Sequence, residues 1–240
     1  MGPSLFRALL RKRRAARGFS LIELLVVLTI ISVVTTIALV GQATFNRSVL
    51  LTDTTYAIAL SLREMQSLGL SSRKTAGVQE AGYGAYFGDA SVNRLTSYVL
   101  FADTVDADAS NVASFPTCQV GASLPAGNPE KKPGDCIYTA GSDQQVQPPL
   151  QLGRGFTISR YCGRSGANLY CSNDATTPLT ALNIVFLRST TETAFLARRN
   201  NAWIALSDAR IYVRSPDTTD ERLICLSVVG QVSVALSTCP

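Results

Sequence analysis

The chain has 240 residues, of which 46% are apolar and 16% charged, so it can bury a core and lacks the composition of a disordered protein. It contains no histidine, which excludes Ser-His-Asp and Cys-His nucleophile systems, H-E-x-x-H zinc sites and histidine proton shuttles. The net charge of +5 is local: residues 1–18 hold six of the 22 basic residues and no acidic one. The other 222 residues carry 16 basic and 17 acidic groups, and are close to neutral.

A long apolar run follows the basic segment. Residues 24–40 carry no charge, and residues 19–40 would extend ~33 Å as a helix, which is enough to cross a bilayer. A secretory signal peptide has a shorter apolar run, and residues 40–43 form only a weak cleavage motif for one. A signal-anchor helix fits the length, and the positive-inside rule then places the N-terminus in the cytoplasm and the rest of the chain outside.

Glu23 does not fit a plain anchor helix. A carboxylate near the centre of a membrane helix costs about 2.5 kcal/mol or more. Near the headgroups it costs less, so a tolerated interfacial glutamate is the alternative. This N-terminus resembles the class III signal peptides of type IV pilins and type II secretion pseudopilins, in its basic leader and in the run Arg17-Gly18-Phe19-Ser20-Leu21-Ile22-Glu23-Leu24-Leu25-Val26-Val27.

The resemblance implies roles for individual residues. Gly18 would end a leader of residues 1–18, and Phe19 would become the new N-terminus, N-methylated by the prepilin peptidase that cuts the bond. Glu23 would pair with the freed amine of Phe19, commonly that of a neighbouring subunit in the filament. The implied partners are prepilin peptidase, other pilin or pseudopilin subunits, the inner-membrane assembly platform and the membrane. The implied location is the cytoplasmic (inner) membrane, crossed once, with assembly into a pilus or pseudopilus.

The helical pattern continues beyond the apolar run. Steps of three and four residues join a stripe of mostly apolar side chains, Phe45, Val49, Thr52, Tyr56, Ala59, Leu62, Met65 and Leu68. We therefore expect one helix of about 50 residues from Phe19 to near Gly69. Its transmembrane part is placed at residues 19–41 and its amphipathic half at residues 42–72.

Short β-type runs follow residue 80. They lie at residues 83–87, 97–102, 137–139, 156–161, 182–188, 194–197, 209–213, 222–229 and 232–236, and Gly230-Gln231 predicts a hairpin turn. A long helix followed by an antiparallel sheet indicates an α+β fold, with residues 73–240 as a β-rich extracytoplasmic domain. In pilins the second half of the helix lies across such a sheet. The layout most resembles minor pseudopilins with an H-like globular domain. Residues 57–66 look like the end of the helix in those proteins.

The cysteines predict disulfides. All six follow the apolar helix, and an even number in an exported domain favours disulfide bonds, with fifteen pairings open. Short loop closures favour the pairs Cys118–Cys136, Cys162–Cys171 and Cys225–Cys239. Zinc is disfavoured, because there is no Cys-x-x-Cys spacing and no histidine.

Two weaker groups of charged residues suggest ligands. Asp103, Asp106 and Asp108 follow a predicted strand and offer the oxygen ligands that calcium prefers, although the EF-hand pattern is absent and a solvated acidic turn is the alternative. Five arginines would form a phosphate-contacting DNA patch if their strands were adjacent, and are otherwise plain surface: Arg198, Arg199, Arg210, Arg214 and Arg222.

Three classes of function remain. The first is a structural, minor subunit of a type II secretion pseudopilus or type IV pilus, processed by prepilin peptidase. The second is a DNA-uptake or adhesive minor pilin that binds a ligand through its head domain. The third is a membrane-anchored enzyme, but the serines and cysteines have no base, and no paired carboxylates lie in an apolar stretch. We predict the first, with no enzymatic activity and no cofactor apart from the calcium alternative.

Overall fold

The computed structural model describes residues 18–71, 82–88, 95–105, 134–187, 191–216 and 220–239. Within these ranges the chain forms one helix, α1 (Leu21–Leu70), and a series of strands. The strands are β1 (Gly82–Gly88), β2 (Ser97–Asp103), β3 (Gln144–Gln145), β4 (Leu150–Gln151), β5 (Thr157–Ser165), β6 (Asn168–Cys171), β7 (Leu179–Phe186), β8 (Thr193–Arg199), β9 (Ala202–Leu206), β10 (Asp208–Arg214), β11 (Glu221–Ser227) and β12 (Val232–Ala235).

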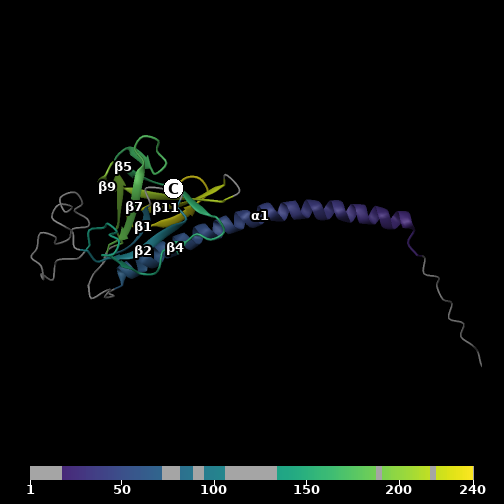
Figure 1. The fold of residues 1–240 in the computed structure, drawn as a ribbon, viewed down its shortest axis with the longest axis horizontal. Helices are drawn as coiled ribbons and strands as arrows, with labels where there is room; N and C mark the ends of the chain where they lie inside the picture. The colour runs from purple at the N-terminus through teal and green to yellow at the C-terminus, as the bar shows by residue number, and fades with distance from the viewer. Residues whose placement is uncertain are drawn as a thin grey trace, which may run out of the picture. The chain divides into compact units, whose positions relative to one another are not determined.

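The chain divides into two compact units, Met1–Asn46 and Arg47–Pro240. Helix α1 contributes to both. In the first unit its described side chains are exposed, whereas in the second its remaining turns pack into a domain with two antiparallel sheets (Figure 1). The predicted α+β class, with an apolar N-terminal helix and an antiparallel β domain, is confirmed. The four domain ranges expected from the sequence stay predictions.

Both sheets are built largely from hairpins between strands that are neighbours in the sequence. The larger sheet has the order β3-β2-β1-β7-β8-β9, with β4 also paired to β2. The smaller sheet has the order β12-β11-β10-β5-β6. Every strand pair is antiparallel, which short connections allow.

The main core joins α1 to both sheets. It contains Leu62 and Met65 from α1, Ile184 from β7 and Ile211 from β10. A second buried cluster covers the opposite face of the larger sheet and includes Val185, the neighbour of Ile184. Since successive strand residues point to opposite faces, β7 is buried along almost its whole length, whereas β10 alternates between buried and half-buried side chains. The smaller sheet therefore keeps a polar outer face.

One predicted strand, residues 137–139, is wrong. These residues are irregular, because side chains rather than a neighbouring strand accept hydrogen bonds from their backbone N–H groups. The N–H of Ile137 donates to Asp135 Oδ1 at 2.9 Å, and that of Thr139 donates to Asp143 Oδ2 at 2.7 Å. The N–H of Tyr138 donates to Asn183 Oδ1 on β7 at 3.0 Å.

Strands β3, β4, β6 and β9 were not predicted. The sequence did contain a signal for β9, the pair Asn200-Asn201 that separates it from β8. In the structure both asparagines have positive φ, at 49° and 62°. Asparagine tolerates this backbone region, and two such residues form the tight turn typical of a hairpin. The predicted hairpin at Gly230-Gln231 is confirmed, with β11 and β12 paired on either side of it.

The predicted stripe of α1 is only partly right. Ala59, Leu62 and Met65 are buried as expected, whereas Phe45, Val49 and Tyr56 are exposed. The buried face also includes Leu51, Thr55, Ile58, Ser61 and Gly69. Thr55 fits this apolar face because its hydroxyl donates to the carbonyl oxygen of Leu51 at 2.7 Å, which satisfies the polar group within the helix.

The structure contains the disulfides Cys162–Cys171 and Cys225–Cys239, which are two of the three expected pairs. The first joins residues directly opposite each other on β5 and β6. The second ties the segment after β12 to β11. Cys136 is also disulfide-bonded, and Cys118, its expected partner, lies outside the described residues.

We predict that Leu62→Ala lowers the free energy of unfolding by about 2–5 kcal/mol, because Leu62 is fully buried between the helix and the sheets. The matched control is Leu60→Ala, two residues away, whose side chain is 60% exposed. The control should change stability by no more than about 0.5 kcal/mol. Urea unfolding of the full chain in detergent micelles measures both. Equal losses in the two variants would contradict the packing of α1 described above.

Candidate functional site

Helix α1 begins immediately after a short non-helical segment, Gly18, Phe19 and Ser20. Ser20 caps the helix: its Oγ accepts a hydrogen bond from the backbone N–H of Glu23 at 3.2 Å, and its carbonyl oxygen accepts one from Leu24 at 3.1 Å. This satisfies one of the N–H groups that a helix start leaves without a partner. Gly18 and Phe19 are exposed, and no atom would contact a side chain at position 18. The bond between them is therefore accessible to a protease.

Glu23 lies in the first turn of α1, four residues after Phe19. Its side chain is exposed, and none of the described residues forms a hydrogen bond or ion pair with its carboxylate. The Ser20-to-Glu23 spacing matches the Ser-x-x-Glu capping pattern, a local role that the sequence interpretation missed although the pattern was readable. A carboxylate in this turn is favoured by the partial positive charge of the helix N-terminus. That local benefit leaves the carboxylate free to accept an outside cation.

The segment Leu21–Leu39 of α1 is long and apolar enough to cross a membrane. Its 19 residues extend ~28 Å as a helix, close to the thickness of the hydrocarbon core. The hydroxyl groups of Thr29, Thr35 and Thr36 donate to backbone carbonyl oxygens three or four residues earlier. They therefore need no water, as a lipid environment requires.

Polar contacts fasten the second half of α1 to the hairpin of β11 and β12. Arg63 Nη2 donates to the carbonyl oxygen of Val232 at 2.9 Å, and Gln66 Nε2 donates to that of Gly230 at 3.0 Å. Gly230 has φ +80°, and a Cβ there would collide with the carbonyl oxygen of Thr191 and with Gln66. Glycine is needed at this position both for the backbone conformation and for the close approach of the helix side chain.

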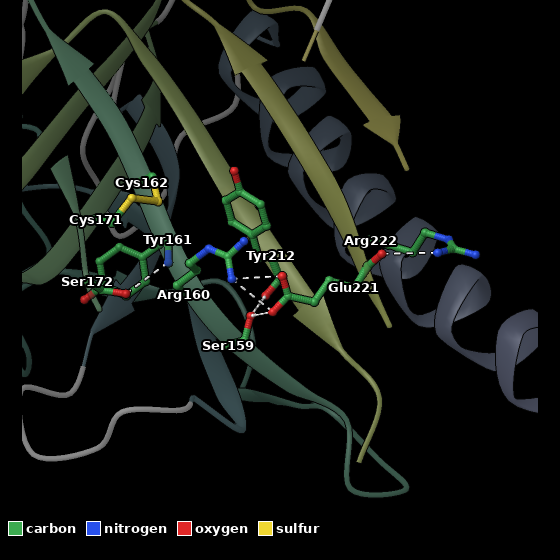
Figure 2. Close-up of polar contacts among 9 residues, drawn as sticks. All are labelled: Ser159, Arg160, Tyr161, Cys162, Cys171, Ser172, Tyr212, Glu221 and Arg222. Carbon is green, nitrogen blue, oxygen red and sulfur yellow. Dashed lines mark hydrogen bonds and ion pairs between the residues drawn. A yellow bond between two sulfur atoms is a disulfide. The ribbon is translucent and has the colours of Figure 1, made fainter. Parts of the chain in front are cut away.

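The outer face of the smaller sheet carries a cluster of polar side chains (Figure 2). The Arg160 guanidinium lies 3.8 Å from the centre of the Tyr212 ring, and its Nη1 is 2.9 Å from Glu221 Oε2. Ser159 Oγ donates to Glu221 Oε1 at 2.7 Å. These contacts join β5, β10 and β11 through side chains. The pairing of an arginine with an aromatic ring and a carboxylate uses both the charge and the flat face of the guanidinium.

The five arginines considered as a conditional DNA-contacting patch are not all brought together. Arg198 and Arg199 lie on β8 in the larger sheet, whereas Arg210, Arg214 and Arg222 lie on β10 and β11 in the smaller one. Several are already engaged within the chain. Arg199 lies over the Tyr170 ring and donates to Thr177 Oγ1 at 2.6 Å, and Arg210 forms an ion pair with Asp208. The condition for a single patch, that the five strand positions be adjacent, is therefore not met.

Of the predicted calcium ligands, Asp103 is described, while Asp106 and Asp108 lie outside the described residues. Asp103 is buried at the end of β2, where its carboxylate accepts backbone hydrogen bonds from Asp135 at 3.2 Å and from Cys136 at 2.7 Å. Within the described ranges, no group of three or more acidic, histidine or cysteine side chains is arranged to hold a metal. The calcium site stays a prediction.

Asp103 belongs to a buried group of carboxylates with Asp135 and Asp143, which the sequence interpretation did not identify. Burial raises the pKa of Asp103 well above its usual value, and the charges of Asp135 and Asp143 raise it further. Burial also raises the pKa of Asp143, and raises that of Asp135 to about 6. Their oxygens accept backbone hydrogen bonds on both sides of residues 106–133, so the three carboxylates hold the two ends of that segment at β2.

Comparison with known proteins identifies the N-terminal segment. Residues 13–39 match the prokaryotic N-terminal methylation motif, the class III signal peptide of type IV pilins and pseudopilins. The match covers Gly18, Phe19, Glu23 and the apolar helix, as the resemblance in the sequence implied. No curated protein and no solved structure matches the chain significantly. The motif and the apolar helix together indicate a membrane-anchored, pilin-like subunit that prepilin peptidase processes.

We predict that prepilin peptidase cleaves between Gly18 and Phe19 and that the mature chain begins with N-methylated Phe19. The reason is that this bond lies in the exposed, non-helical segment directly before the capped helix. Intact-mass analysis of the protein from a host with the peptidase measures the new end. Gly18→Leu should leave the chain uncleaved, while Ser20→Ala should still be cleaved. A mature end near Ala43 would contradict the assignment.

The raised pKa of Asp135 predicts how stability depends on pH. Folding favours the protonated acid, so its contribution is complete below pH 3.8, the usual pKa, and is lost as the pH rises through about 6. Asp135→Asn removes this loss. The free energy of unfolding of the variant relative to wild type should therefore rise between pH 4.5 and pH 7.5, as urea unfolding at both pH values would measure.

The matched control for this experiment is Asp174→Asn. Asp174 is exposed, and hydrogen bonds from the backbone and hydroxyl of Thr176 lower its pKa below the usual value. Its contribution to stability is therefore complete above pH 3.8, the usual pKa, and is lost only as the pH falls below that value. The difference between this variant and wild type should stay constant from pH 4.5 to pH 7.5. A constant difference for Asp135→Asn as well would contradict the costly burial of its charge.

Proposed function

We propose that this chain is the precursor of a structural, minor subunit of a type II secretion pseudopilus or type IV pilus. The observation that carries the proposal is the continuity of α1 from the methylation motif into the core of the β domain. One helix thus supplies both the processed, apolar end and the element on which the folded domain is built. This is the arrangement a subunit needs if its helix is held among other helices while its domain stays outside the membrane.

The subunit is a structural protein rather than an enzyme in this proposal. The methylation motif supports a role in assembly, and the Arg160–Glu221 pair links neighbouring strands. The resemblance of the helix end to minor pseudopilins with an H-like domain supports the minor role. The DNA-uptake alternative has less support, because the arginines expected to bind phosphate lie on different sheets. Its partners would be other pilin-like subunits and the inner-membrane assembly platform.

Glu23 is the residue proposed to guide assembly. Its carboxylate has no partner among the described residues, and cleavage at Gly18 would create a free amine on Phe19 within an otherwise apolar environment. A charge in low dielectric needs a partner, and removing one member of such a pair costs about 3–5 kcal/mol. An ion pair between the Glu23 carboxylate of one subunit and the Phe19 amine of another would therefore fix how a subunit enters the filament.

The experiment is the substitution Glu23→Gln. Cleavage and membrane insertion should be unchanged, because the leader and the apolar run are intact. Recovery of the subunit in sheared filaments, measured relative to its level in the membrane, should fall by roughly tenfold or more. Glu64→Gln, a matched change on an exposed position of the same helix, should be recovered like wild type. Equal recovery of all three proteins would show that Glu23 is only a tolerated interfacial residue.

A further inference from the structure

A pocket of about 390 Å³ lies on the outer face of the smaller sheet, entirely within the β domain. Its volume falls at the lower end of the range for small-molecule sites, roughly 300–1,000 Å³. No part of the assembly role proposed above uses it. The strands that form its floor are β10, β11 and β12, and its wall is the segment after β12 that the Cys225–Cys239 disulfide ties to β11.

The register of these strands explains why the lining residues meet. Arg210 is paired with Cys225, and Cys225 is paired with Ser233, so these three form one row across the sheet. Asp208 and Ser227 form the neighbouring row, and Tyr212 and Leu223 form the row on the other side. The alternation of β10 directs Asp208, Arg210 and Tyr212 away from the core, because the residues between them are buried.

The charges that line the pocket leave guanidinium donors available. Asp208 accepts three hydrogen bonds: two at Oδ2 from Arg210, and one at Oδ1 from the backbone N–H of Arg164. Arg210 has a side chain only 14% exposed, and three of its five N–H donors have no acceptor among the described residues. The Arg164 side chain also lines the pocket and forms no hydrogen bond with any described residue. Arg210 is therefore partly desolvated, whereas Arg164 is exposed at the edge of the pocket. Guanidinium groups with unused N–H donors favour a carboxylate, to which arginine can donate two parallel hydrogen bonds.

The remaining lining is rich in hydroxyl groups. Within the described part of the chain, the hydroxyls of Tyr212, Ser233, Ser237 and Thr238 form no hydrogen bonds. Each can both donate and accept, which suits a ligand that carries hydroxyl groups itself. The Cys225–Cys239 disulfide adds a small apolar area beside them, whereas Leu223 also lines the pocket but is only 1% exposed. The Arg160 guanidinium lies over the Tyr212 ring (Figure 2), and this contact favours that position of the ring.

We propose that this pocket binds an acidic sugar, with its carboxylate at Arg164 and Arg210. A uronic acid combines the three properties that the lining requires: one carboxylate, several hydroxyl groups and an apolar ring face of C–H groups. Arg210 already pairs with Asp208, so a neutral sugar would leave the Arg164 guanidinium without an anion and three Arg210 donors without a charged acceptor. An inorganic phosphate would not use the apolar area or the outer hydroxyls. The same chemistry occurs in a free uronic acid and in a residue of an acidic polysaccharide.

The proposal is tested by calorimetric titration of the full chain in detergent micelles, with its disulfides intact. The probes are D-galacturonate, its linear trimer, D-galactose and inorganic phosphate. Galacturonate or the trimer should bind saturably. Galactose, which has a hydroxymethyl group in place of the carboxylate, should bind at least roughly tenfold more weakly. Tighter binding of the trimer than of the monomer would identify a polysaccharide as the source, and equal binding would identify the free sugar.

Two variants link the binding to this pocket. Arg164→Gln removes an exposed guanidinium without disturbing the core, and should weaken galacturonate binding roughly tenfold. Arg198→Gln, a matched loss of an exposed arginine on the other sheet, should bind like wild type. Saturable binding that both variants retain, phosphate binding as tight as galacturonate binding, equal binding of galactose, or no binding of either acidic sugar would each overturn the proposal. None of these results would affect the assembly role, whose test depends on Glu23.

Discussion

The apolar side chains of Leu21–Leu39 place the strongest constraint on this protein. They are exposed along the whole segment, and transferring them out of water contributes about 25 cal/mol for each Å² of apolar surface. Lipid would supply the apolar surroundings that the segment requires, and neighbouring helices would supply them in the proposed filament. The capped start of the helix and the internally bonded threonines leave few polar groups unsatisfied in such surroundings. Glu23 is the exception, which is why its partner matters.

The second half of the same helix meets the opposite condition. Leu62 and Met65 are completely buried against two sheets, and Arg63 and Gln66 on its flank donate to the β11–β12 hairpin. Two disulfides stabilise this domain further, each typically adding about 2–4 kcal/mol to the free energy of unfolding by restricting the unfolded chain. The β domain therefore has a core of its own. The outer face of the smaller sheet does not pack against α1, and it holds the polar pocket.

The sequence predicted the elements whose signals are local. The apolar run and the alternation in β10 each lie within a few residues, and the helix and the strand they predicted are confirmed. The cleavage expected after Gly18 stays a prediction. The failures concern features that depend on distant partners. Residues 137–139 have β-type side chains, but their N–H groups bond to Asp135, Asp143 and Asn183. The buried face of α1 was predicted only in part: Leu51, Thr55 and Ile58 were missed, because Thr55 counts as polar in the sequence although its hydroxyl is satisfied inside the helix.

The same distinction applies to the candidate sites. Gly18, Phe19 and Glu23 form a continuous motif, so the processing site could be predicted without a fold. The pocket could not, because Arg164, Arg210 and Thr238 are far apart in the sequence and meet only through the strand order of the smaller sheet and the Cys225–Cys239 bond. The arginines show the converse. Residues 198–222 are close together in the sequence, but the strands that carry their arginines belong to different sheets.

The central claim is that this chain enters a filament only after its N-terminus has been cleaved. The most direct measurement compares sheared filaments from cells with and without prepilin peptidase, using intact mass to identify the chain in each fraction. The account predicts the chain beginning at Phe19 in the filament fraction only when the peptidase is present, and the uncleaved chain in the membrane otherwise. Filaments that contain the chain with residues 1–18 still attached, or a cleaved chain that never leaves the membrane fraction, would contradict it.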